Sequence, residues 1–135
     1  MIKCHFVIDK THKNKKFKNI FLTKYKNYLP RLSNVIVVLG GDGFMLQTLK
    51  KFQKFNKPFY GINSGTFGFL MNKFKTYDVI KNISRAKFVS ISPLSMKVIT
   101  KTGKIYSNIA INEVSLLRQT RQAASLQIAS GKKIL

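Results

Sequence analysis

The chain has 135 residues, the size of one ordinary domain or of one small domain with part of another. Apolar residues make up 44% of it, which is enough for a real core, and no apolar run is long enough to span a membrane. The N-terminus lacks the apolar segment of a signal peptide, so we expect neither a secreted nor a membrane protein.

The charge of the chain is strongly unbalanced. Lys and Arg number 25 against 4 Asp and Glu, which gives a formal net charge of +21. A field of this sign attracts nucleotides, nucleic acids and acidic membranes. The lysines are spread along the chain, with one dense patch from Lys10 to Lys18, and this spread is typical of a genome-wide preference for Lys, Asn and Ile. The field would still help a site for a multiply charged nucleotide.

The chain contains a single cysteine, Cys4, which lies in the first predicted strand. One cysteine cannot form an internal disulfide, and this fits the reducing cytoplasm, where we expect the protein to reside. Cys4 is interpreted as a small core residue rather than a nucleophile. The two histidines, His5 and His12, have no partner cluster of Cys, His or carboxylates, so we do not expect them to bind a metal.

The first third of the chain predicts a strand, a loop and a helix. Lys3 to Ile8 is a short apolar run typical of a strand, and Asp9 to Lys16 is polar and loop-like. From Phe17 onward, apolar residues recur at the spacing of an amphipathic helix. They are Phe17, Ile20, Phe21, Tyr25, Tyr28 and Leu29.

The next segment predicts a buried strand that runs into a glycine turn and a second helix. Residues 35–39 are five apolar residues rich in Val and Ile, which suits a strand covered on both faces of a parallel sheet. The turn Gly40-Gly41-Asp42-Gly43 follows, and its glycines would let the backbone bend sharply and approach a ligand. Met45, Leu49 and Phe52 are then spaced for one face of a helix.

The glycine turn has the chemistry of a phosphate site with one carboxylate in it. The N-terminus of a helix favours phosphate, and Asp42 is the only acid for more than thirty residues in either direction. A carboxylate there makes sense if it accepts a proton or holds a metal that bridges phosphates. A plain strand-to-helix turn would use the same four residues, so both interpretations stay open at this point. Leu46 stands where a dinucleotide fingerprint would have its third glycine, and no P-loop sequence follows.

A second glycine-rich loop follows a third predicted strand, Phe59 to Ile62. Two parallel strands that both end in glycine loops place those loops along one edge of the sheet, where ligands bind in open α/β folds. The loop, residues 61–70, would otherwise be a plain turn, with Phe67 and Phe69 serving as core anchors. We expect that role to hold in part for Phe69.

The remaining segments change character from α/β to β. Lys75 to Ser84 predicts a weaker helix. Short alternating segments after Pro93 predict a β-meander with strands at residues 96–100, 105–111, 113–117 and 125–129 and a turn at 101–104. We therefore expect an α/β nucleotide-binding domain over residues 1–93 and an incomplete β-rich domain over 94–135. A lone β domain of 42 residues is near the size at which too little surface can be buried.

Three motifs in this order resemble those of the NAD kinase family. They are Gly40-Gly41-Asp42-Gly43, Gly61-Ile62-Asn63-Ser64-Gly65-Thr66-Phe67-Gly68-Phe69, and Asn112-Glu113-Val114 with Arg118 shortly after. The first motif alone is shared with diacylglycerol and sphingosine kinases and with 6-phosphofructokinases, so a lipid kinase or phosphofructokinase-type relative is the alternative within kinases. The second and third motifs favour NAD.

The resemblance implies a Rossmann-like parallel sheet with flanking helices, the start of a β-sandwich-like domain, and an active site between the two. It implies ATP-dependent phosphorylation of the 2′-hydroxyl of the adenosine ribose of NAD to give NADP, with Mg²⁺ or another divalent metal on the phosphates. Asp42 would activate the hydroxyl. Gly41 and Gly43 would line the phosphates, Asn63 and Phe69 would lie on the NAD side, and Asn112 and Glu113 would bind the substrate nucleotide by hydrogen bonds.

Two departures from the family pattern leave other functions open. Phe44 replaces the hydroxyl residue that commonly follows Gly-Asp-Gly, and the later Thr-Pro-x-Gly-Ser-Thr-Ala-Tyr-like segment has no counterpart here. The alternatives are a catalytically dead nucleotide-binding remnant and a small basic nucleic-acid-binding protein, the latter favoured only by charge. As partners we expect NAD and ATP and further copies of the chain, with no membrane and no specific nucleic acid.

If the net charge reflects composition alone, the chain should bind duplex DNA weakly, without sequence preference, and lose this binding steeply with added salt. Fluorescence anisotropy with two unrelated duplexes over a salt series measures this. Tight binding to one sequence at physiological salt would instead favour the nucleic-acid-binding hypothesis.

Overall fold

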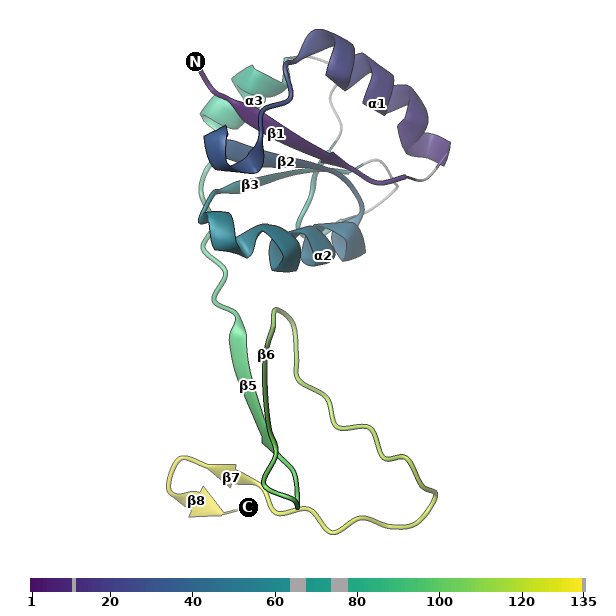
Figure 1. Cartoon of the computed structure of the whole chain (residues 1–135), viewed down its shortest axis with the longest axis vertical. Helices are drawn as coiled ribbons and strands as arrows, with labels where there is room; N and C mark the ends of the chain where they lie inside the picture. Colours follow the sequence, from purple (N-terminus) through teal and green to yellow (C-terminus); the bar gives the residue numbers. More distant parts are fainter. Residues whose placement is uncertain (11, 64–67, 74–77, 135) are drawn as a thin grey trace. The chain divides into compact units, whose positions relative to one another are not determined.

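The computed structural model describes residues 1–10, 12–63, 68–73 and 78–134. The chain divides into two compact units, Met1–Val89 and Ser90–Leu135, which are treated separately below. The first contains a four-stranded parallel sheet with helices, and the second contains small antiparallel strand pairs (Figure 1). The predicted fold class is thus confirmed. Two compact units do not by themselves establish two functional domains, so the division at residue 93 stays a prediction.

The sheet of the first unit has the order β1-β2-β3-β4, with every neighbouring pair parallel. Its strands are β1 (Cys4–Ile8), β2 (Val35–Gly40), β3 (Phe59–Asn63) and the short β4 (Asn72–Lys73). All six residues of β2 are buried. A central parallel strand has neighbours on both edges and helices on both faces, which explains why its sequence is almost continuously apolar.

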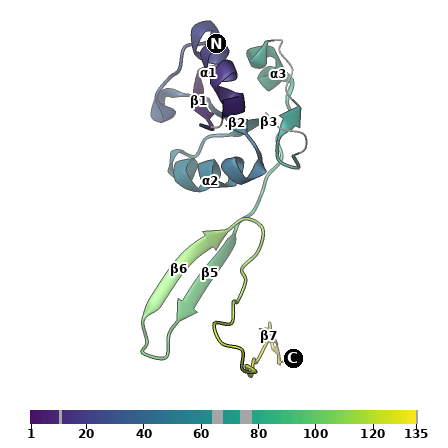
Figure 2. The ribbon, with the colours of Figure 1, turned by 90° about the vertical axis from the view of Figure 1, so that its right-hand side faces the viewer.

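Helices cover both faces of this sheet (Figures 1 and 2). The helices α1 (His12–Lys24) and α3 (Val79–Arg85) pack on one face, against a core cluster that includes Val35, Val37 and Leu39. Helix α2 (Asp42–Phe52) packs on the other face, against a cluster that includes Ile36 and Val38. Alternate residues of β2 therefore supply two separate cores, as the two-residue period of a strand requires.

The first helix differs from the prediction at both ends. It begins at His12, inside the stretch predicted to be a loop, and it ends at Lys24, so Tyr25, Tyr28 and Leu29 lie outside it. The backbone N–H of Tyr28 donates to the Cys4 carbonyl oxygen at 3.0 Å, and the Phe6 N–H donates to Asn27 Oδ1 at 2.9 Å. The segment after the helix thus covers the open edge of β1, which otherwise would have unpaired backbone groups.

Cys4 is a core residue, as predicted. Its side chain is 2% exposed, and burial raises the pKa of the thiol to about 11. The thiolate, which is the nucleophilic form, is therefore scarce at neutral pH. None of the helices in the described part of the chain is long and apolar enough to cross a membrane.

The second unit contains two short antiparallel pairs. The strands β5 (Leu94–Ile99) and β6 (Ile105–Ala110) form a hairpin, and β7 (Ala129–Ser130) pairs with β8 (Lys133–Ile134). The predicted strand at 113–117 is wrong, and of the predicted strand at 125–129 only Ala129 is in a strand. A strand needs a hydrogen-bonded neighbour, and the described residues provide none for residues 113–117 and 125–128.

The apolar side chains of the second unit are not covered within the described part of that unit. None of its described residues is buried, although many are large and apolar. Those more than two-fifths exposed are Ile91, Leu94, Val98, Ile99, Ile105, Tyr106, Val114, Leu116, Leu117, Leu126, Ile128 and Ile134. Hairpins of two strands are marginal in water, and exposed apolar patches favour association.

The chain should therefore associate with itself at high concentration, through the apolar faces of the hairpin. Ile99 and Ile105, which are paired across it, are exposed by 62% and 56%. Replacing both with Lys should reduce association in sedimentation velocity over a concentration series. Ile20→Lys on α1, which is 50% exposed, is the matched control and should change little. A monodisperse monomer with a cooperative, high-temperature melt would contradict the expectation.

Candidate functional site

The two glycine loops of the first unit begin at the same edge of the sheet. Gly40, the last residue of β2, is paired in register with Asn63, the last residue of β3. Because both strands are parallel, the chain leaves the sheet on the same side after each of them. This confirms the predicted proximity for the described residues, whereas residues 64–67 of the second loop lie outside them.

The first loop is shorter than the sequence suggested. Gly41 is extended, with φ −106° and ψ 179°, and helix α2 begins immediately at Asp42. The Met45 N–H donates to the Gly41 carbonyl oxygen at 3.0 Å, which closes the first turn. The N–H groups ahead of Met45 are those that a helix leaves without intrahelical partners, so they remain available to an anion.

The glycines of this loop are not explained by backbone conformation. Among the described glycines only Gly103 and Gly131, both in the second unit, have positive φ. A Cβ placed on Gly41 or Gly43 would meet no atom within 4 Å. The space beside both residues is thus open, so the expected sharp bend is not the reason for glycine here. Open space beside bare backbone is what close approach by a phosphate group requires.

Phe44 has a structural role at the position where the family commonly has a hydroxyl residue. Its ring packs over Gly40, where an added Cβ would lie 2.8 Å from the ring atom Cδ1. Phe44 also packs against the core cluster beneath α2. The aromatic ring thus adds core packing on this face of the sheet, and no hydroxyl is supplied from this position.

The carboxylate of Asp42 joins the two loops. The Phe69 N–H donates to Oδ2 at 2.7 Å, and the Leu70 N–H donates to Oδ1 at 3.2 Å. Hydrogen bonds to an ionised acceptor are stronger than neutral ones. A carboxylate has about four lone-pair sites, so each oxygen keeps capacity for one more donor or for a metal. Asp42 therefore holds the second loop and can still face a ligand.

Asn63 and Gly68 complete this cluster. Asn63 is 8% exposed at the end of β3. A Cβ on Gly68 would lie 2.9 Å from Asp42 Oδ1 and 3.0 Å from Asn63 Nδ2, so both side chains converge on this glycine. Gly68 was not predicted as a site residue. The glycines of the second loop indicated a turn, but only the three-dimensional contacts show that Gly68 is crowded by Asp42 and Asn63.

Phe69 is not a core anchor. Its backbone is fixed to Asp42, whereas its side chain is fully exposed, at 103% of its reference area. The predicted partial core role is therefore wrong. An exposed ring on a backbone held in place can stack on a flat ligand without first being ordered. Phe67, the other predicted aromatic, lies outside the described residues.

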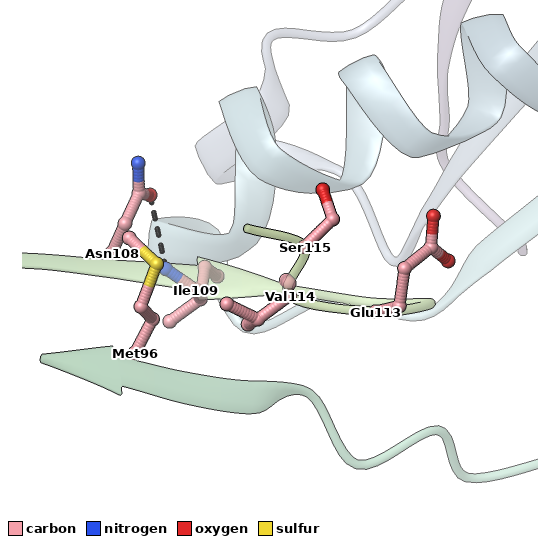
Figure 3. A pocket seen from close by; sticks show the side chains of 7 residues that line it. Met96, Asn108, Ile109, Glu113, Val114 and Ser115 are labelled. Atoms are coloured by element: carbon pink, nitrogen blue, oxygen red, sulfur yellow. Dashed lines mark hydrogen bonds between the residues drawn. The ribbon is translucent and has the colours of Figure 1, made fainter. Parts of the chain in front are cut away.

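The other two predicted residues belong to the second unit and are described with it. Asn112 and Glu113 follow β6, and both are exposed. Glu113 lines a small pocket of about 170 Å³ (Figure 3). The other lining residues are Met96, Asn108, Ile109, Ala110, Val114 and Ser115. Asn108 Oδ1 accepts a hydrogen bond from the Ile109 N–H at 2.9 Å, the dashed line in Figure 3.

The described residues contain no group of three or more His, Cys, Asp or Glu side chains that could hold a metal. Two carboxylates lie at this edge of the sheet in the described part of the first unit: Asp42, and Asp9, which directly follows β1 and whose N–H donates to the Leu39 carbonyl oxygen at 3.0 Å. Mg²⁺ is usually held by one or two carboxylates together with substrate phosphates rather than by a cage of protein ligands. The donor set thus fits a metal that arrives on a nucleotide.

Comparison with known proteins identifies this architecture. Residues 5–86 match the model of the ATP-NAD kinase N-terminal domain. The chain belongs to the NAD kinase family. The match covers the glycine turn and the second loop, and therefore every residue of the Asp42 cluster.

Individual proteins that match most of this chain are also NAD kinases. The NAD kinase of Cereibacter sphaeroides strain ATCC 17029 is 42% identical over 116 residues, which are 86% of this chain and 46% of that protein. The NAD kinase of strain ATCC 17025 is 47% identical over 102 residues, or 76% and 40%. That of Rickettsia africae is 44% identical over 96 residues, or 71% and 38%. The matched part of the chain thus corresponds to less than half of each relative.

The two bonds to Asp42 predict that Asn is a poor replacement there. An amide has one carbonyl oxygen, so Asp42→Asn would lose one acceptor and turn an NH₂ group toward a backbone N–H. We expect it to lower the free energy of unfolding by about 1–3 kcal/mol, measured by urea denaturation.

Asp78→Asn is the matched control. Asp78 caps α3 and accepts one bond, from the Lys81 N–H at 3.3 Å, and Asn caps helices equally well. Its cost should be below about 0.5 kcal/mol. Equal effects of the two substitutions would show that the Asp42 bonds contribute nothing particular.

Proposed function

We propose that this chain supplies the nucleotide-binding part of an NAD kinase, which transfers a phosphoryl group from ATP to the 2′-hydroxyl of the adenosine ribose of NAD to give NADP. One observation carries the proposal. Asp42 is at the first position of α2, beside free helix N–H groups, and its carboxylate is bonded to the second loop. A proton acceptor, an anion site and an exposed aromatic ring thus occur in one cluster.

These residues need to form no covalent bond with the substrates, because phosphoryl transfer depends chiefly on positioning and on neutralising charge. Asp42 accepts the proton of the 2′-hydroxyl through a lone pair that the loop does not use. The backbone at Gly41 and Gly43 borders the phosphates, where no side chain obstructs their approach. Helix α2 adds the positive end of its dipole, which favours the negative charge of the transferred group.

NAD is placed by the second loop in this proposal. Phe69 offers an exposed ring for stacking, and Asn63, whose amide also borders Gly68, lies on the same side of the site. In the second unit, Asn112 and Glu113 supply further hydrogen bonds to the substrate nucleotide, and Glu113 does so from the wall of its pocket. The proposed partners are NAD, ATP and further copies of the chain, in the cytoplasm.

Mg²⁺ or another divalent metal would accompany ATP. When bound, the metal would supply positive charge that neutralises the phosphates. Asp42 is the residue of the described cluster that can approach it, because its carboxylate keeps free lone pairs beside the helix N-terminus. The net charge of +21 supports nucleotide binding, because a positive field concentrates multiply charged nucleotides near the site.

The test is ATP-dependent NADP formation. The chain would be assayed alone and also as a chimera. In the chimera, the part of the Cereibacter sphaeroides NAD kinase that lies beyond the matched segment is fused to the C-terminus of this chain. In the chimera, Asp42→Asn should lower turnover by about 10²- to 10⁴-fold, since it removes general-base assistance and a loop contact. Asp78→Asn, far along the sequence and outside the site, should leave turnover unchanged.

Three results would contradict the proposal. Near-normal turnover of the Asp42→Asn chimera would exclude Asp42 from the mechanism. NAD binding without any NADP formation in the unsubstituted chimera would favour the nucleotide-binding remnant instead. Phosphorylation of diacylglycerol or of a sugar phosphate in preference to NAD would favour a relative that shares only the Gly-Gly-Asp-Gly turn.

A further inference from the structure

Backbone conformation does not explain why residue 68 is a glycine. Its φ is not in the left-handed region, so an L side chain is allowed by the backbone. Space is what is lacking. The nearest atoms to an added Cβ would be Asp42 Oδ1 at 2.9 Å, Asn63 Nδ2 at 3.0 Å and Met71 Cβ at 3.1 Å.

These three neighbours come from three different parts of the chain, so the gap is closed on several sides. Asp42 starts α2, Asn63 ends β3, and Met71 immediately precedes β4. A methyl group pushed away from Asp42 would approach one of the other two. The carboxylate would have to shift, or the loop would have to withdraw, and either movement lengthens the bonds to Phe69 and Leu70.

We propose that Gly68 is a positioning residue of the site: its missing side chain leaves the gap through which the Asp42 carboxylate reaches the N–H groups of Phe69 and Leu70. Gly68 touches no substrate in this account and acts only through Asp42. In this way Gly68 fixes the position of the exposed Phe69 ring, which the proposed function places on the NAD side of the site. The effect of Gly68 on NAD binding rests on that proposed function.

The contact itself is tested by amide hydrogen exchange, which needs neither substrate nor turnover. NMR on the full 135-residue chain would compare Phe69 and Leu70 with Val37 and Val38 in the buried strand β2. Gly68→Ala should speed exchange at Phe69 and Leu70 by about tenfold or more and leave the β2 amides unchanged. In this exchange measurement Gly43→Ala is the matched control, because its Cβ would meet nothing within 4 Å.

A double variant decides whether Gly68 acts through Asp42. Asp42→Ala removes the carboxylate, and Gly68→Ala added to it should have no further effect on exchange. If Gly68→Ala alone does not fold, Asp42→Ala should restore folding, because the methyl group then occupies the space that the carboxylate leaves. Unchanged exchange in Gly68→Ala, additive effects, or a double variant that stays unfolded would overturn the proposal.

NAD affinity separates a positioning role from a merely structural one. Isothermal titration, at a temperature below the unfolding transition of Gly68→Ala, should show weaker NAD binding in this variant than in the unsubstituted chain. Faster exchange with unchanged affinity would overturn the assignment of Gly68 as a positioning residue. If the unsubstituted chain binds no NAD, the proposed function fails for this chain, whereas the exchange result still decides the contact between Gly68 and Asp42.

Discussion

The bond between one carboxylate and two backbone N–H groups connects the parts of this protein that matter for chemistry. Asp42 accepts hydrogen bonds from the N–H groups of Phe69 and Leu70, which lie 27 and 28 residues further along the sequence. This contact ties the described end of the second loop, at Phe69 and Leu70, to the start of α2. The same acid thus has a structural use beside the chemical use proposed for it, and each would limit the substitutions that the other tolerates. Gly68 marks the constraint most directly, because the contact requires a position without a side chain.

That contact depends in turn on the buried strand β2. Its register with β3 brings Gly40 opposite Asn63, and this places the two loops on one edge of the sheet. The strand is buried on both faces because helices pack on each side of it. Burying apolar surface on both faces stabilises the sheet, and a stable sheet holds the start of α2 where its N–H groups and Asp42 are needed.

The second unit has a different physical character. Its strand pairs satisfy their own backbone groups, but none of its described residues is buried. The apolar side chains of the hairpin therefore lack the contacts that stabilise the first unit, and their exposure favours association. Glu113 and its neighbours line a pocket in this unit, so residues expected to bind the nucleotide are carried by the less well packed part of the chain.

The sequence by itself determined the central strand, its glycine turn, the parallel arrangement and the family, because hydrophobic periodicity and motif order are local properties. It misplaced Tyr28, which pairs with β1 rather than continuing the helix, and the segment 113–117, which lacks a neighbouring strand. The exposure of Phe69 and the crowding at Gly68 were decided by tertiary structure alone. Both depend on distances between residues far apart in the chain, and no pattern of nearby residues encodes those distances.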